Sequence, residues 1–212
     1  APALGLYEKL AAIGDMTSAK NLSATEIASV DIEDALTEAM FALGSGDTYL
    51  RLFGPLLSWL QEHGAAVIIE KLVKILHRRS TEGNDSSYAV LFASFALAQG
   101  HKRWSTVVDS FARKESMQRL FGPPDIAESL LSLRGEEEWA RGSGFRVPKG
   151  SAGTDRKWTL SRKGLARVNR QYRNRLIYGA QWRADIITAY ELGARTPSAA
   201  SRMSGASYEP CH

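Results

Sequence analysis

The sequence predicts a mainly α-helical protein, and two observations support that prediction. Apolar residues recur at helical spacing through most of the chain, between residues typical of helix starts and helix stops. Two short runs of β type, separated by glycine, serine, proline and basic residues, follow the sixth expected helix. We therefore expect three units: an acidic all-helical domain over residues 1–85, a basic domain of helices and a hairpin over 86–175, and an incomplete helical unit over 176–212.

The first domain is expected to consist of helices with short breaks. Asp31 can cap a helix that stops at Gly44, where glycine would supply a left-handed conformation. The Gly54-Pro55 pair should kink or split the following helix. The expected helices cover residues 32–43, 48–61 and 65–79. The TEGNDS segment, residues 81–86, then marks a flexible domain boundary.

The second domain is expected to have three helices and then a hairpin. The helices cover residues 87–99, 105–114 and 124–133, and the β-type runs cover 139–147 and 157–160. This is the element order of a winged helix, with a basic, glycine-rich wing. From Leu165 the chain should be helical again. Its apolar stripe is formed by Leu165, Val168, Tyr172 and Leu176, and this linking helix either packs on its own domain or forms a dimer.

Charge is distributed unevenly along the chain. Residues 1–100 hold 7 Lys/Arg against 12 Asp/Glu, a balance of −5, whereas residues 101–212 hold 20 against 11, a balance of +9. Between Arg141 and Arg183, twelve basic residues accompany a single acid, Asp155. A polyanion such as double-stranded DNA is the natural partner of this stretch, provided that its cations form one surface. The predicted phosphate contacts are Arg146, Lys149, Arg156, Lys157, Arg162, Lys163, Arg167, Arg170 and Arg173.

Two segments resemble bacterial winged-helix transcription regulators. In KWTLSRKGLARV, Trp158, Leu160 and Gly164 match a strand that turns directly into a helix, with Ser161 where threonine is usual. The stretch RLIYGAQWRADIITAYELGARTPSAASRMSGASYEP resembles the opening of regulators of the broad arsenical-repressor-like kind. That resemblance implies a helix-turn-helix near the end of the chain and DNA as the partner.

The terminal helix-turn-helix also has physical support. Thr196 can cap a helix that begins at Pro197, and Gly205 permits a left-handed turn between the two helices. The inner face of the first helix would be formed by Ala199, Ala200 and Met203. Ser201 occupies the position four residues before the turn glycine, where alanine would pack better.

Ser207 would cap the second helix, whose first residues would face base edges in the major groove. The predicted DNA-binding residues there are Ser207, Tyr208 and His212, with Glu209 beside them. A recognition helix of six residues cannot stabilise itself, so we expect the native chain to continue past His212.

Other classes of function have little support in the sequence. The GSGFRVPKGS segment has the wrong order for a phosphate-binding loop, and the four histidines lack the spacing of metal ligands. No catalytic constellation stands out, so we expect no enzyme activity and no cofactor or metal. The longest apolar runs are too short to cross a bilayer, and the lone Cys211 fits a reducing compartment, so we expect a cytoplasmic protein.

These observations favour a DNA-binding transcription regulator that acts as a homodimer on a palindromic site. The helical N-terminal domain could contact a protein partner. The alternative hypothesis is an interaction or scaffold subunit whose winged helix binds protein. A ligand-responsive sensor would require a closed apolar pocket within residues 31–115.

Overall fold

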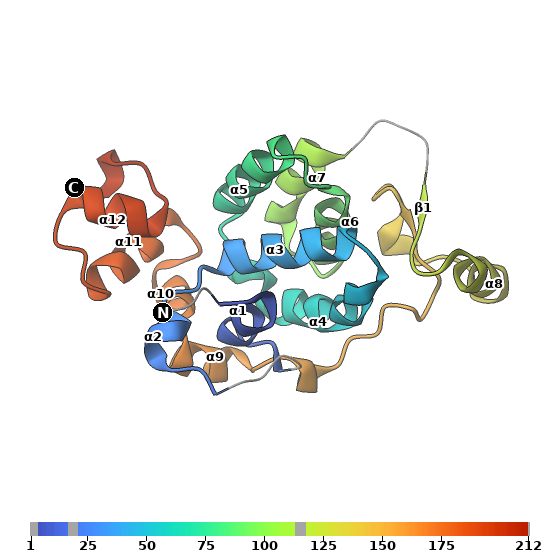
Figure 1. Ribbon diagram of the computed structural model, residues 1–212, viewed down its shortest axis with the longest axis horizontal. Coiled ribbons are helices and arrows are strands. Elements are labelled where there is room, and N and C mark those ends of the chain that lie inside the picture. Colours follow the sequence, from blue (N-terminus) through green and yellow to red (C-terminus); the bar gives the residue numbers. More distant parts are fainter. Residues whose placement is uncertain (1–3, 17–20, 113–117, 212) are drawn as a thin grey trace.

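We describe residues 4–16, 21–112 and 118–211 of a computed structural model (Figure 1). The protein is mainly helical, as expected. The helices are α1 (Leu6–Ala12), α2 (Ala24–Ala28), α3 (Ile32–Gly44), α4 (Phe53–His63), α5 (Ile69–Thr81), α6 (Ser87–Ala98), α7 (Ser105–Phe111), α8 (Pro124–Arg134), α9 (Arg162–Val168), α10 (Arg170–Tyr178), α11 (Trp182–Glu191) and α12 (Pro197–Ser204). Short 3-10 turns connect several of them, among them η2 (Asp47–Leu52), η3 (Gly64–Ala66), η4 (Lys102–Trp104), η5 (Glu138–Ala140), η6 (Arg156–Trp158) and η7 (Glu209–Cys211).

One large hydrophobic core occupies the middle of the molecule. It extends along the chain from Leu10 through Trp59 and Phe92 to Tyr172, so residues on both sides of segment 81–86 contribute to it. A second, small cluster belongs to the last two helices and the segment after them, and it consists of Ile186, Ala189, Ala194, Ala200, Ala206 and Cys211. Figure 1 shows α11 and α12 at one end of the long axis and α8 with β1 at the other.

Helix α3 confirms the cap that the sequence indicates. The Asp31 carboxylate accepts a hydrogen bond from the Asp34 amide at 3.1 Å, which satisfies a backbone donor of the first turn. The expected stop at Gly44 is wrong: Gly44 is the last helical residue, and Ser45 ends the helix in a right-handed conformation. The hydroxyl of Ser45 donates to the Ala42 carbonyl at 2.7 Å, so this end needs no left-handed glycine.

The next two helices differ from their expected limits. The Gly54-Pro55 pair does split the expected helix: η2 ends at Leu52, and α4 begins at Phe53 with proline in its first turn. Gly54 also lets Trp158 approach closely, because a Cβ at this position would lie 2.8 Å from the Trp158 ring. Helix α5 begins at Ile69 rather than near residue 65, because η3 precedes it.

The expected wing hairpin does not form. Strand β2 (Phe145–Arg146) pairs in parallel with β1 (Arg119–Leu120), which precedes α8. The second β-type run instead holds η6, and Thr159 forms an antiparallel bridge with Asp15 near the N-terminus. Neighbouring runs of β type in a sequence usually pair with each other, but here the first run pairs with β1 and the second with Asp15.

The expected linking helix is broken into α9 and α10 at Asn169. The buried Asn169 side chain donates to the Ala12 carbonyl at 3.0 Å and accepts from the Tyr172 amide at 2.8 Å, so it ties the break to α1 and caps α10. Leu165 and Tyr172 of the predicted stripe are buried, whereas Val168 and Leu176 are half exposed. Each half of the predicted stripe therefore contributes one residue to the core and leaves one at the surface.

Within the described ranges, we find no helix that combines the length and the apolar character needed to span a bilayer.

Candidate nucleic-acid interface and its attachment

The last described elements include the first helix and the left-handed turn of the helix-turn-helix that the sequence predicts. The Thr196 hydroxyl accepts a hydrogen bond from the Ala199 amide at 3.2 Å, and Pro197 is the first residue of α12. Gly205 ends α12 in the left-handed conformation, with φ of 74°. The predicted second helix, capped by Ser207, is wrong for the described residues: the chain leads instead into η7, a 3-10 turn of three residues that starts at Glu209.

The turn is closed by a hydrogen bond that the sequence analysis did not anticipate. Ser201 donates through its hydroxyl to the Ala206 carbonyl at 2.8 Å, so serine stabilises the turn where alanine could not. Ala200 of α12 is fully buried in the small cluster that α12 forms with α11, as expected. The expected inner-face position of Met203 is wrong: Met203 is half exposed, and Ser204 is the buried residue at the end of α12.

The segment after the turn has both buried and exposed residues, and Ala206 and Cys211 belong to the small hydrophobic cluster. Ser207 and Tyr208 are exposed, as base-reading residues would have to be. The Ser207 carbonyl accepts a hydrogen bond from the Cys211 thiol at 3.3 Å, which brings η7 back onto the turn. His212, the remaining predicted reader, lies outside the described residues.

A buried guanidinium attaches this unit to the rest of the molecule. Arg175 of α10 is fully buried, and it forms two-point ion pairs with Glu33 of α3, at 2.6 and 2.7 Å, and with Asp185 of α11, both at 2.8 Å. Its remaining hydrogen bond, at 3.1 Å, goes to the Ala66 carbonyl. All five N–H donors of the guanidinium are therefore used, which fixes three helices and η3 relative to one another.

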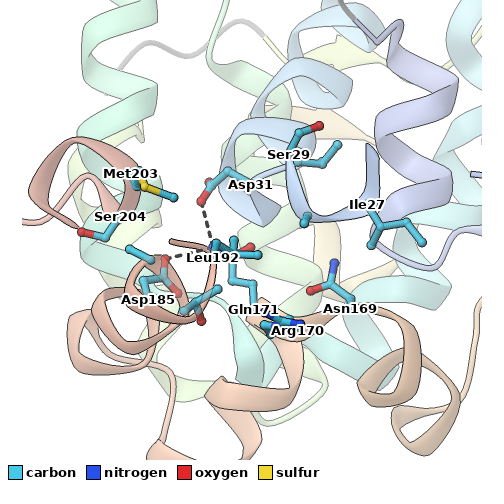
Figure 2. Close-up of a pocket in the computed structure, with 14 residues that line it drawn as sticks. Ile27, Ser29, Asp31, Asn169, Arg170, Gln171, Asp185, Leu192, Met203 and Ser204 are labelled. Atoms are coloured by element: carbon cyan, nitrogen blue, oxygen red, sulfur yellow. Dashed lines mark hydrogen bonds between the residues drawn. The ribbon is translucent and has the colours of Figure 1, made fainter. Parts of the chain in front are cut away.

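A lysine and a glutamine extend this contact. Lys71 of α5 forms ion pairs with Asp31 and, at 2.6 Å, with Asp185. The Gln171 amide nitrogen donates to Asp31 at 2.8 Å and to Asp185 at 2.9 Å, as Figure 2 shows, and its oxygen accepts from the Ile32 amide at 3.2 Å. A cavity of about 220 Å³ lies beside these residues, between the start of α3 and helices α10 to α12.

We call Asp31, Glu33, Lys71, Arg175 and Asp185 the charged junction. Burial opposes ionisation of Asp31, but Lys71 and Arg175 outweigh it and hold the pKa of Asp31 below its usual value. Burial likewise opposes a charge on Lys71, yet the three carboxylates raise its pKa. Burial raises the pKa of Glu33 despite its pairing with Arg175.

The three carboxylates of the charged junction approach one another closely enough to hold a cation. In the structure Arg175 and Lys71 already occupy the positions between them. The cluster therefore acts as an ion-pair network that carries one excess negative charge, and Asp31, the most exposed of its acids, lies at the edge.

The chain was also compared with family models, curated proteins and solved structures. None of the three comparisons finds a match.

The predicted phosphate contacts do not form one unpaired surface. Five of the nine are ion-paired: Arg146 with Glu136, Lys157 with Asp155, Arg162 with Glu62, and both Arg170 and Arg173 with Glu191. The other four, for which the described part of the chain offers no ion pair, are Lys149, Arg156, Lys163 and Arg167. Acids from α4 and α11 thus neutralise part of the basic stretch, a pairing that the local sequence does not show.

Sequence reasoning missed the charged junction altogether. Arg175 was counted as one more surface cation, although it lies three residues after the buried Tyr172 and so shares its helix face. Its partner Glu33 is 142 residues away, and no local pattern connects the two. The position of Asp185 between Ala184 and Ile186, on the buried side of α11, was the one available signal.

Replacing Gly205 with alanine should lower the free energy of unfolding by about 1 kcal/mol, because an L side chain is strained at this positive φ. Space is not the cause, since an added Cβ would meet its nearest neighbours at an ordinary 3.8 Å. Urea unfolding followed by circular dichroism measures the change. Gly153→Ala is the matched control: Gly153 lacks a positive φ and has open space around it, so a comparable loss there would contradict the explanation.

Proposed function

We propose that this protein binds double-stranded DNA through the beginning of a helix-turn-helix, formed by α12, the turn at Gly205 and the segment after it, and that it acts as a transcription regulator. The observation that carries the proposal is the turn itself. The Thr196 cap and Pro197 begin α12, and the left-handed Gly205 ends it. Ser207 and Tyr208 are exposed beyond this turn.

Cations beside the turn support the same assignment. Arg183 lies in the first turn of α11, and Arg195 immediately precedes the Thr196 cap of α12; both are exposed, and neither is ion-paired within the described ranges. In a helix-turn-helix the first helix, here α12, crosses the phosphate backbone, so Arg195 suits a phosphate contact. Arg183 belongs to α11, which packs against α12, and is the second candidate. Lys163 and Arg167 of α9 are further phosphate candidates, and the proposal does not require the wing.

Fluorescence anisotropy with a labelled mixed-sequence duplex, at several salt concentrations, tests the proposal on the whole chain. Each phosphate contact contributes about −0.9 to the slope of log K against log salt, so Arg183→Gln with Arg195→Gln should reduce the slope by about 2. Tyr208→Ala should reduce selectivity between duplexes and leave that slope unchanged.

The control variant, Arg134→Gln with Arg141→Gln, removes the same charge in the last turn of α8 and directly after η5. Helix α8 lies at the opposite end of the molecule from α11 and α12 (Figure 1). It should bind like the unaltered protein. Equal losses in both double variants would show that attraction is general and does not involve the helix-turn-helix. Absence of salt-dependent binding by the folded protein would overturn the proposal.

The second candidate function is an interaction or scaffold subunit, and one observation favours it. Leu176, Ile177 and Tyr178, at the end of α10, are 49, 62 and 44% exposed. Three adjacent apolar side chains at the surface are typical of a protein contact. Sedimentation of the protein with and without Ile177→Glu tests this: a dimer abolished by the substitution, without DNA binding, would favour the scaffold.

A further inference from the structure

A groove separates α5 from the C-terminal end of α12. Its volume is about 300 Å³, and it is open to solvent next to the turn of the helix-turn-helix. Its walls carry four cationic and two acidic side chains together with Trp182. The lining residues that matter here are Lys71, Lys74, Arg78, Arg202, Asp31 and Asp34.

Three of the cations have donors to spare. Lys74 makes one long hydrogen bond, 3.4 Å to the Gly205 carbonyl, and keeps two N–H groups. Arg78 approaches Asp34 only to 4.0 Å, with both side chains mostly exposed. Arg202, on α12, has no ion pair in the part of the chain that the structure describes. These groups come from segments about 125 residues apart in sequence and line the same groove.

The rest of the lining favours an anion as well. Asp31 is paired with Lys71 and hydrogen-bonded to Gln171, and Asp34 lies 4.0 Å from Arg78. The four cations of the groove outnumber its two acids. The Trp182 ring lies 6.0 Å from the Lys74 ammonium and forms an apolar wall, where charge-assisted hydrogen bonds are stronger than in bulk water. The buried Ser204 hydroxyl accepts from the Ala206 amide at 3.2 Å, and its own hydrogen remains available as a donor.

We propose that this groove is a phosphate-binding site in which Lys74, Arg78 and Arg202 contact the oxyanion. The phosphate comes either from the backbone of bound DNA, in which case the inference rests on the proposed function, or from a free phosphorylated molecule. The groove lies beside the turn at Gly205, which suits a phosphate of bound DNA. The DNA backbone passes close to the protein residues that enter the major groove.

The test uses the whole chain and a double variant, Lys74→Gln with Arg202→Gln, with Arg134→Gln and Arg141→Gln as the control of equal charge. Isothermal titration with inorganic phosphate, at constant ionic strength against chloride, measures the site alone. Fluorescence anisotropy with labelled duplex DNA measures whether the DNA backbone binds in the groove. Thermal melting verifies that both variants are folded, as expected for exposed positions.

We expect phosphate to bind the unaltered and the control proteins equally and the groove variant at least about tenfold more weakly, since two charge-assisted contacts are lost. If DNA affinity falls in parallel, the site serves the backbone. If DNA affinity is unchanged or DNA does not bind at all, the site takes a free phosphorylated molecule, and the inference stands without the proposed function. Equal phosphate binding by all three proteins, or none by any, would overturn it.

Discussion

Replacing Arg175 with methionine should lower the free energy of unfolding by about 3–5 kcal/mol. The substitution keeps much of the side-chain volume but leaves Glu33 and Asp185 buried without their shared cation. Lys71 cannot compensate, because it already pairs with Asp31 and Asp185 and stays 3.8 Å from Glu33. Urea unfolding, followed by tryptophan fluorescence, measures the loss.

Arg173→Gln is the matched control for this prediction. Arg173 is on the same helix and pairs with Glu191 at 3.4 Å, but both side chains are well exposed. Exposed pairs of this kind contribute about 0–1 kcal/mol, so the control should remain close to the unaltered protein. A small effect of Arg175→Met would mean that the charged junction tolerates an unpaired carboxylate, contrary to its burial.

Acidification should destabilise the protein through His63. His63 is the last residue of α4, and its side chain is buried. Its Nε2 donates to the Leu160 carbonyl at 2.8 Å, and its Nδ1 accepts from the Tyr172 hydroxyl at 2.7 Å. We assign this neutral form because a carbonyl can only accept. A second proton on Nδ1 would remove this acceptor, so the Tyr172 hydroxyl hydrogen would lose its partner in a buried site.

Burial, with Arg162 nearby, lowers the pKa of His63 from 6.5 to about 4. Between these values the unfolded chain takes up a proton that the folded protein does not. The contribution of neutral His63 to stability is therefore complete above pH 6.5 and is lost as the pH falls toward 4. At about 1.4 kcal/mol per pH unit, the loss is about 3 kcal/mol over this window.

Urea unfolding at several pH values tests this linkage. The protein should lose stability steadily from pH 6.5 to 4, and His63→Gln should flatten that part of the profile while lowering stability at pH 7. His77→Gln, at an exposed position, should leave the slope unchanged. An unaltered slope in the His63 variant would assign the acid sensitivity to carboxylates instead.

The sequence allowed the local elements to be predicted because their signals lie within a few residues. The Asp31 cap, the split at Gly54-Pro55 and the whole of Thr196 to Gly205 follow from short-range backbone chemistry. The wing failed for the opposite reason. Strand partners are chosen by tertiary packing, and β2 found β1 across an intervening helix rather than its sequence neighbour.

The candidate site was predictable only in part, for the same reason. The turn and its exposed residues could be located, because one glycine and one proline define them. The charged junction and the groove could not be located. Glu33 meets Arg175 and Lys71, and Lys71 lines the same groove as Arg202, only after the chain folds. A count of local charge cannot distinguish a cation that faces solvent from one that holds two helices together.

Asp185 belongs to α11, the helix that packs against α12, so the charged junction fixes the position of the last two helices. The Arg175 guanidinium makes two hydrogen bonds to Asp185 of α11 and two to Glu33 of α3. The orientation of Tyr208 relative to the large hydrophobic core is therefore fixed. A bound duplex would have to bend or shift to suit that orientation. Operators that deform easily should then be favoured over stiff ones with identical contacted bases.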